Sequence, residues 1–281
     1  MTSTDWMNPG HEDNESVDLQ TDRPHPARVY DYLLGGKDHF AADRAAGDEA
    51  LRVKPEAKAS PLENRAFLQR VVRYLAAEAG IRQFLDIGTG LPTPPNVHEV
   101  AQGVVPDARI VYTDNDPIVL AHARALLASS RAGRTAYIDA DLRDPDSILS
   151  APGLRETLDL SQPTAVLLFA IMHFITDQDG PYDIVSRLLD ALPAGSYLAM
   201  SHVTGDFDPQ AWAEVTAVYA KNGMALRPRS RPEVEHFFTG LDLAEPGVVS
   251  VPRWRRGPGD GQPGPSSDSA VSAYGALARK P

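Results

Sequence analysis

The chain contains no cysteine, which excludes a disulfide framework, a thiolate nucleophile and a cysteine metal site. It also has no uninterrupted apolar run of about 18 residues, the length that a membrane-spanning helix needs. Residues 1–22 have neither a basic start nor an apolar stretch, so they do not resemble a signal peptide. We therefore expect a cytoplasmic protein with no membrane partner.

Basic residues are also few. The 27 Lys and Arg residues stand against 38 Asp and Glu, which gives a formal net charge of −11, whereas a nucleic-acid-binding surface usually shows a basic stripe. The eight histidines show no His-x-His or His-x-x-x-His spacing, so we expect no metal site. We likewise do not expect a nucleic-acid partner.

The chain does contain three short apolar runs that each end on a carboxylate. Asp86, Asp114 and Asp141 are 28 and 27 residues apart, about the length of a strand, a loop and a covering helix. This pattern predicts three successive strands of a parallel sheet, which bring their carboxylates to the edge where such sheets bind ligands. Gly88 and Gly90, directly after the first strand, would let the backbone approach a ligand closely.

The positions of the three carboxylates predict a nucleoside-like ligand. Asp86 can accept hydrogen bonds from an amine or organise the glycine loop. Asp114 lies 24 residues after Gly90, close to the separation at which an acid reaches ribose hydroxyls in dinucleotide folds. Asp141 could accept from an adenine amino group. Aspartate at a strand end often serves turn geometry alone, but the regular spacing behind a glycine turn favours a binding site.

The glycine loop lacks the third glycine of a dinucleotide site. It reads Gly88-Thr89-Gly90-Leu91-Pro92-Thr93-Pro94-Pro95. We predict that Thr93 caps the next helix with Pro94 and Pro95 in its first turn, where proline has no N–H to hold a diphosphate. S-adenosylmethionine (SAM) keeps the adenine and ribose but has no phosphate. SAM is therefore the predicted cofactor, and a nicotinamide or flavin is the weaker alternative.

Composition divides the chain into three parts. Residues 1–23 are predicted to be a disordered acidic arm, residues 24–80 an N-terminal helical segment that includes a lid, and residues 81–281 the SAM-binding domain, with a flexible Gly/Pro-rich loop at 257–269. The predicted helices of the second part are Pro26–Leu34, which ends at a Gly-Gly C-cap signal, Lys37–Leu51, and a third that starts at the capping box Ser60 to Glu63.

From Gln83 onward, predicted strands and helices alternate. Ala165–Ile171 is a continuous apolar run, which is typical of a central strand covered on both faces. The last two of seven strands are predicted at Gly247–Val251 and Val271–Ala278. We therefore predict an α/β, Rossmann-like fold with a seven-stranded, mostly parallel sheet and helices on both faces. A polar cap followed by proline marks four predicted helix starts, at Thr93, Asp116, Asp144 and Asp208.

Five local motifs are more specific than this order of elements. They read Arg28-Val29-Tyr30-Asp31-Tyr32-Leu33-Leu34-Gly35-Gly36-Lys37, Asn64-Arg65, Gln83-Phe84-Leu85-Asp86-Ile87-Gly88-Thr89-Gly90-Leu91-Pro92-Thr93, Asn96-Val97-His98-Glu99 and Tyr112-Thr113-Asp114-Asn115-Asp116-Pro117. Together they resemble a bacterial family of uncharacterised SAM-dependent methyltransferases, also described as a domain of unknown function. The order of elements resembles the class I SAM-dependent methyltransferase superfamily.

The resemblance implies methyl transfer with SAM and a site of known layout. A glycine motif wraps the methionine moiety, an acid ending the second strand binds the ribose, and an acid and the next backbone N–H hold the adenine edge. Pro92 to Pro95 depart from this pattern, so N–H contacts after the glycines would be lost or replaced. The expected SAM contacts, with neighbours, are Tyr30, Arg65, Asp86, Gly88, Thr89, Gly90, Leu91, Asp114, Asn115, Asp141, Leu142, Phe169 and Ala170.

Two histidines are candidate catalytic residues. His173 follows the fourth strand and is the better candidate base, because an unperturbed imidazole titrates near neutral pH. Its alternative role is to pack on the adenine or to satisfy a backbone group. His202 lies just past the fifth strand at the same edge. Trp212 and Tyr219 share one helix face, where we expect core packing.

We expect a small-molecule methyl acceptor. The chain has no Asn-Pro-Pro-Tyr-like motif, which argues against methylation of exocyclic amines on bases. The lack of cysteine excludes covalent C5-pyrimidine chemistry. Because no base is unambiguous, a catalytically inactive SAM-binding sensor or regulatory protein is the competing hypothesis, and a nicotinamide-dependent oxidoreductase is a third.

Overall fold

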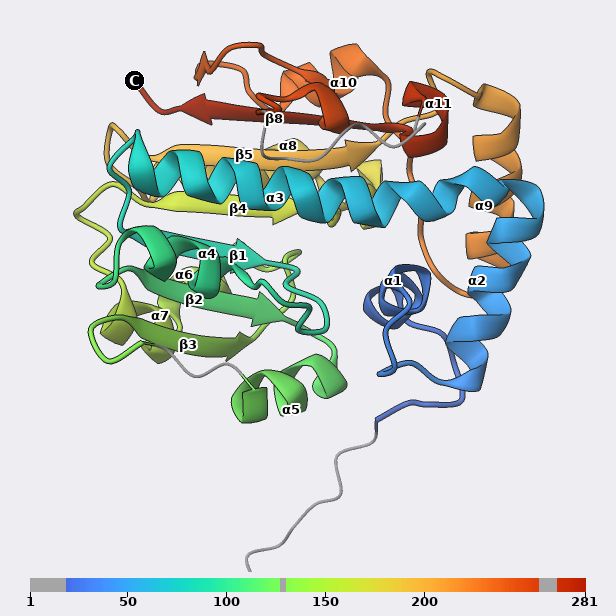
Figure 1. The fold of residues 1–281 in the computed structure, drawn as a ribbon, viewed down its shortest axis with the longest axis horizontal. Helices are drawn as coiled ribbons and strands as arrows, with labels where there is room; N and C mark the ends of the chain where they lie inside the picture. The colour runs from blue at the N-terminus through green and yellow to red at the C-terminus, as the bar shows by residue number, and fades with distance from the viewer. Residues whose placement is uncertain (1–18, 127–129, 258–266) are drawn as a thin grey trace, which may run out of the picture.

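The computed structural model describes residues 19–126, 130–257 and 267–281. Its centre is a sheet in which five strands run parallel and a later strand, β8, runs antiparallel beside β5 (Figure 1). The strand order is β3-β2-β1-β4-β5-β8-β6, with β7 also paired to β8. The strands are β1 (Gln83–Ile87), β2 (Arg109–Asp114), β3 (Arg134–Asp139), β4 (Ala165–Phe169), β5 (Tyr197–Val203), β6 (Asp242–Leu243), β7 (Val249–Ser250) and β8 (Ala273–Arg279).

The predicted α/β fold with a mostly parallel sheet is confirmed. The chain builds outward from β1 through β2 to β3, then crosses back and adds β4 and β5 on the other side of β1. This change of direction places a crevice at the carboxyl ends of β1 and β4, the usual position for a ligand in open α/β sheets. Asp86 lies in β1, paired with Tyr112 of β2 and Leu167 of β4, so its carboxyl group is near that crevice.

The end of the sheet differs from the prediction. β6 was not expected, β7 is shorter than Gly247–Val251, and the sheet has eight strands where seven were predicted. Strands of two residues show no alternation that a sequence pattern could reveal. Asp268–Val271 forms a short helix, α11, capped by the Ser267 side chain. This helix covers the end of the expected loop at 257–269 and the first residue of the expected strand Val271–Ala278, so β8 begins only at Ala273. Residues 258–266, like most of the expected acidic arm, lie outside the described part.

Apolar residues on both faces of the strands explain the helix layers. Phe84 of β1 packs in one cluster with α3 and α4, whereas the next residue, Leu85, packs in the opposite cluster with α6, α7 and α8. Figure 1 shows α3 running along one face of the sheet. The helices behind these clusters are α3 (Ala59–Ala77), α4 (Val97–Val104), α6 (Pro145–Ser150), α7 (Pro152–Thr157), α8 (Pro181–Asp190) and α10 (Arg231–His236).

No helix in the described ranges is long and apolar enough to cross a membrane.

Three of the four predicted polar caps are confirmed. Asp116 accepts from the N–H of Ile118 at 2.9 Å at the start of α5 (Pro117–Leu126), and the Asp144 and Asp208 side chains cap α6 and α9 (Pro209–Lys221) in the same way. The prediction for Thr93 is wrong. Helix α4 begins at Val97 instead.

Stronger local partners explain the two misplaced helix starts. The Glu99 side chain accepts from the backbone N–H of Asn96 at 2.6 Å, so a capping box starts α4 after the prolines. Ser60 does not start α3 either. A 3₁₀ turn, Pro55–Lys58, runs directly into α3 at Ala59 and places Ser60 inside the helix.

Two N-terminal helices, α1 (Pro26–Leu34) and α2 (Ala41–Val53), form what we call the lid. Figure 1 shows the lid beyond the carboxyl ends of the parallel strands, with α2 beside α9. Helix α2 begins later than the predicted Lys37, because the connecting turn wraps the buried side chain of Asp31. Its carboxylate accepts from the N–H of Asp38 at 3.0 Å, and a Cβ on Gly36 would come within 1.9 Å of it.

A buried charge cluster joins the lid to the start of α5. Arg28 of α1 is 2 % exposed, and its Nε lies 3.2 Å from Asp116 Oδ2, without hydrogen-bond alignment, and 3.8 Å from Asp43 Oδ1 of α2. His25 Nδ1 lies 3.0 Å from Asp116 as well. Burial alone would raise the pKa of Asp116, yet His25 and Arg28 hold it below its ordinary value. Asp116, at the start of α5, thus supplies one carboxylate, and the lid supplies Arg28 and Asp43.

Replacing Arg28 with methionine should destabilise the fold strongly, because two buried carboxylates would lose their cationic partner. Breaking a buried pair typically costs about 3–5 kcal/mol. Lys221→Met is the matched control, since Lys221 also joins α9 to the lid, through Glu49, but is 69 % exposed, and exposed pairs contribute about 1 kcal/mol or less. Urea unfolding measures both variants, and equal losses would contradict the role of the cluster.

Candidate functional site

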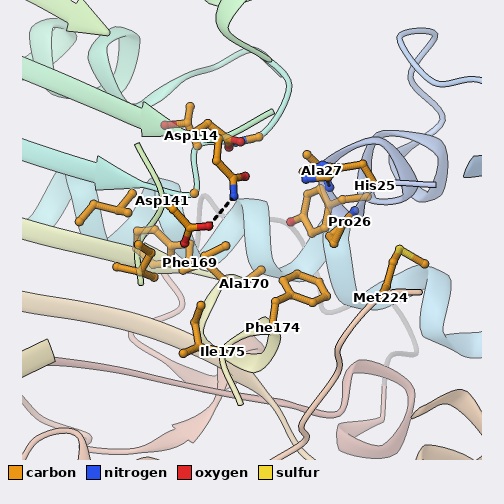
Figure 2. Close-up of a pocket in the computed structure, with 18 of the residues that line it drawn as sticks. His25, Pro26, Ala27, Asp114, Asp141, Phe169, Ala170, Phe174, Ile175 and Met224 are labelled. Atoms are coloured by element: carbon orange, nitrogen blue, oxygen red, sulfur yellow. Dashed lines mark hydrogen bonds between the residues drawn. The ribbon is translucent and has the colours of Figure 1, made fainter. Parts of the chain in front are cut away.

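A cavity of about 380 Å³ lies between the carboxyl ends of the parallel strands and the lid. We call it the SAM cavity, after the cofactor that the sequence predicts. Figure 2 shows Asp114 and Asp141 on the sheet side, with His25, Pro26 and Ala27 of the lid side facing them. Small-molecule sites typically have volumes of about 300–1,000 Å³. The topological switch point and the lid therefore enclose a space of cofactor size.

The glycine loop closes one side of this cavity. Gly88 and Gly90 have φ values of +72° and +67°, in the left-handed region that side chains rarely adopt. A Cβ on Gly88 would lie 2.6 Å from the Ile171 side chain. The N–H of Gly88 donates to the carbonyl of Thr113 at 2.8 Å, which folds the loop back onto the end of β2. The sequence therefore needs glycine at both positions.

Asp114 organises the loop while facing the cavity. Its Oδ2 accepts from the N–H of Gly90 at 2.8 Å, and its Oδ1 accepts from the N–H of Asp116 at 3.0 Å. Burial raises its pKa, against the effect of these two bonds. A carboxylate offers about four acceptor positions, so two remain for a ligand with paired hydroxyls, such as a ribose.

Asp141 and Asn115 lie together at the neighbouring strand ends. The Asn115 side chain donates to Asp141 Oδ2 at 3.1 Å, the dashed line in Figure 2. The other oxygen of Asp141 accepts from the backbone N–H of Arg143 at 2.8 Å. Strand β3 ends at Asp139, so Asp141 belongs to the loop after the strand, where Leu142 also lines the cavity. This pair forms the polar edge of one end of the cavity.

The carboxyl group of Asp86 is buried with little to balance a charge. It is 5 % exposed, and its carboxyl group has no hydrogen bond from any described residue. Burial raises its pKa to about 7, although the Arg65 guanidinium opposes this shift. A cationic amine would supply the missing hydrogen bonds and charge. This is a good fit for the ammonium group of the methionine moiety of SAM.

Arg65 and Tyr30 line the same cavity from helices. Arg65 of α3 donates to the carbonyls of Thr93 and Pro95, the latter at 2.6 Å, and so holds the proline segment, while its Nε has no hydrogen-bond partner. The Tyr30 hydroxyl donates to the Pro61 carbonyl at 3.1 Å. Arg65 thus holds in place the segment after the glycines, where prolines stand at positions that would otherwise carry a backbone N–H donor.

A hydrogen-bond chain runs from the lid to the sheet edge. Asn64 donates to the Tyr30 hydroxyl at 2.9 Å and accepts from the Ser201 hydroxyl at 2.6 Å, and Ser201 accepts from the N–H of Ala170 at 2.9 Å. Ala170 has a φ of +54°, an uncommon backbone for a residue with a side chain. Such backbone strain often clusters at functional sites.

The structure brings most of the expected SAM contacts together, with one exception. Leu91 does not line the cavity but packs with Ile118 and Val119 in a small apolar cluster. The expected contacts that do line it are Tyr30, Arg65, Asp86, Gly88, Thr89, Gly90, Asp114, Asn115, Asp141, Leu142, Phe169 and Ala170.

Several lining residues had no sequence signal. His25 and Met224 belong to the lid side and to the segment after α9, which reach the cavity only through tertiary packing. Arg143 lies two residues after Asp141 and pairs with it at 3.0 Å, so the nearby acid was the one clue. Such long-range neighbours cannot be read from local periodicity.

The two candidate catalytic histidines lie outside the SAM cavity and differ from each other. Of His202, Nδ1 lies 2.7 Å from the Val203 carbonyl and Nε2 lies 3.0 Å from Arg229, so both ring nitrogens have partners. Burial lowers its pKa to about 3. His173 lies in the 3₁₀ turn Met172–Phe174, and its Nδ1 has no hydrogen-bond partner. Burial, with nearby His202 and Arg229, holds the pKa of His173 well below its ordinary value.

Comparison with known proteins shows which family the chain belongs to. Residues 12–281 match the model of the S-adenosyl methyltransferase family. The chain belongs to this family. It is 51 % identical to a DUF574 family protein from Streptomyces avermitilis MA-4680, with a TM-score of 0.91 over 94 % of this chain and 100 % of the other. A methyltransferase candidate from Thermobifida fusca YX is 44 % identical, with a TM-score of 0.85 over 93 % and 97 %. No curated protein matches the chain.

The S-adenosyl methyltransferase family confirms the predicted enzyme class and its cofactor, SAM. The SAM cavity fits that molecule, because it offers an unbalanced carboxyl group at Asp86 and spare acceptor positions at Asp114. Bound there, SAM supplies a methyl group made electrophilic by its sulfonium. We expect Asp86 to bind the ammonium, Asp114 the ribose and Asp141 with Leu142 the adenine edge.

The affinity for S-adenosylhomocysteine should fall as the pH drops through about 7, where Asp86 takes up a proton and loses its charge. The limit is about tenfold per pH unit. Calorimetry between about pH 5.5 and 7.5 measures this dependence. Asp86→Asn should bind more weakly, with an affinity that no longer follows this protonation. Equal slopes for the two proteins would contradict the assignment.

Without ligand, Asp86 should make stability depend on pH in the opposite sense to an ordinary salt-bridged acid. Its folded pKa of about 7 lies above the ordinary 3.8, so between these values the folded protein binds the extra proton and the free energy of unfolding falls as pH rises. Asp86→Asn should gain stability relative to the natural chain at about pH 8 and lose that gain toward pH 4. Urea unfolding at several pH values tests this, and a pH-independent difference would refute it.

Proposed function

We propose that this methyltransferase modifies a small-molecule acceptor that the lid encloses. The supporting observation is a second cavity, of about 80 Å³, which we call the lid cavity. It adjoins the SAM cavity, since Pro26, Tyr30, Asn64, Ala170 and Phe174 line both. A methyl donor in one cavity and an acceptor in the other would meet at this shared wall.

The walls of the lid cavity favour a small acceptor. They come from α1, α2 and α9 and from the ends of β4 and β5, with Leu33, Leu51 and Trp212 among the lining residues. A cavity of about 80 Å³ has room for a compact group. The net charge of −11 also opposes a nucleic-acid acceptor.

The residues between the two cavities would orient the reaction. The chain of Tyr30, Asn64 and Ser201 fixes the wall to the lid on one side and to the sheet on the other. Effective positioning of this kind contributes much of the rate enhancement in bimolecular group transfer. A lid that packs against both cavities would also exclude water from the reacting centre.

When the protein is incubated with methyl-labelled SAM and an extract of small molecules, the label should appear in the fraction that passes a small-pore filter. Asp114→Asn should reduce incorporation by at least about tenfold, because an amide cannot replace both charge-assisted bonds of the carboxylate. Asp242→Asn, at an exposed residue of β6, is the control and should keep full activity.

Binding of SAM without any incorporation would favour the competing sensor hypothesis over the transferase. Label that appears only in protein or RNA would contradict the proposal of a small-molecule acceptor.

A further inference from the structure

The lid cavity has an uncharged lining. No Asp, Glu, Lys or Arg is among the described residues that line it, and its wall is mostly apolar. A charged acceptor group would lose its hydration there without gaining a counter-ion, which is strongly unfavourable. The lining residues from the lid, α9 and β5 include Leu33, Ala50, Leu51, Val203, Trp212, Val215 and Tyr219. The part of the acceptor that enters this cavity is therefore uncharged and largely apolar.

Two polar groups in this apolar wall have no hydrogen-bond partner. They are Nδ1 of His173, a residue 5 % exposed, and Nε1 of Trp212, a residue 6 % exposed. Buried polar groups in native proteins nearly always have a partner. Core packing, which the sequence predicted for Trp212, accounts for its ring and leaves its N–H unexplained. Both residues line the lid cavity, so a ligand there could supply a partner that the described residues do not.

His202 lines the same cavity but is already occupied. Its ring lies 5.5 Å from the His173 ring, and its two nitrogens are bonded to the Val203 carbonyl and to Arg229. Arg229 is fully buried and also donates to the Met172 carbonyl at 3.0 Å, which fixes the turn that carries His173. His202 and Arg229 therefore position His173, whose Nδ1 stays free.

We propose that the lid cavity binds the methyl acceptor as a small, uncharged aromatic ring with a hydroxyl group, packed against Trp212 and Phe174 and hydrogen-bonded to His173. The proposal rests on the transferase function above. In the reaction, the acceptor oxygen gains the methyl carbon as that carbon leaves sulfur, the O–H bond breaks, and the proton passes to the free nitrogen of His173.

The weak basicity of His173 selects a phenol over an aliphatic alcohol. Burial and the cation of Arg229 hold the pKa of His173 well below its ordinary value, so the imidazole is neutral but a poor proton acceptor. A phenolic hydroxyl has a pKa of about 10, far closer to an imidazole than the hydroxyl of water at about 15.7. A phenol therefore passes its proton to this imidazole more readily than an aliphatic alcohol does.

Phenol itself is a suitable probe, because its single ring suits a cavity of about 80 Å³. The chain has three tryptophans, so a protein labelled with nitrogen-15 in tryptophan gives three indole N–H signals, and Trp212→Phe identifies the one from the cavity. In protein saturated with S-adenosylhomocysteine, phenol should shift the Trp212 signal in a saturable way. Benzoate, similar in size but charged, should leave it unchanged.

His173→Gln should weaken phenol binding about 3- to 10-fold, the effect of one net hydrogen bond, and leave the affinity for S-adenosylhomocysteine unchanged. His236→Gln, at an exposed histidine of α10, is the matched control. With labelled SAM, phenol methylation by His173→Gln should rise with pH toward the ionisation of phenol, because the variant lacks its own proton acceptor.

Three results would overturn the proposal: no shift of the Trp212 signal with phenol, an equal shift with benzoate, or equal phenol affinity in the two histidine variants. Each of them is separate from failure of the proposed function. That failure would show as no methylation of any small molecule, whereas the acceptor proposal can fail while S-adenosylhomocysteine binds and other small molecules are methylated.

Discussion

One buried carboxylate, that of Asp114, holds together the parts of the molecule that form the site. It accepts from Gly90 in the glycine loop and from Asp116 at the start of α5. Asp116 in turn caps α5 and lies 3.2 Å from Arg28 of the lid. The glycine loop, the end of β2 and the lid are thus connected through adjacent acids. Replacing either acid would therefore disturb the loop, the strand and the lid together.

Burial of ionisable side chains away from water determines their charge in the site. Burial raises the pKa of Asp86 to about 7 and lowers that of His173 well below its ordinary value. Both shifts favour the neutral form, since low-dielectric surroundings disfavour charge of either sign. The two cavities therefore differ. The SAM cavity keeps carboxylates that a cationic ligand can satisfy, whereas the lining of the lid cavity offers nothing to balance a charge.

The parts of the fold that were predicted correctly are those with long or repeated signals. The regular spacing of three acids and the apolar run into Phe169 predicted the parallel sheet and the edge where its cavity lies. Signals of a few residues failed where two rules competed. Thr93 followed by proline satisfied one capping rule, but Asn96 with Glu99 satisfied a stronger one, because two bonds form reciprocally in a capping box. The two-residue strand β6 left no pattern.

Non-local contacts explain what the sequence could not distinguish. We expected His173 after the fourth strand and His202 just past the fifth, but His202 lies within β5. Arg229, which is 27 residues beyond His202, bonds to His202 and not to His173. Leu91 likewise points into an apolar cluster because Ile118 lies across from it. A motif predicts which residues reach an edge of the sheet. Which of them keeps a free polar atom depends on partners that folding brings in. In this protein those partners occupy both ring nitrogens of His202 and leave Nδ1 of His173 without a hydrogen bond from any described residue.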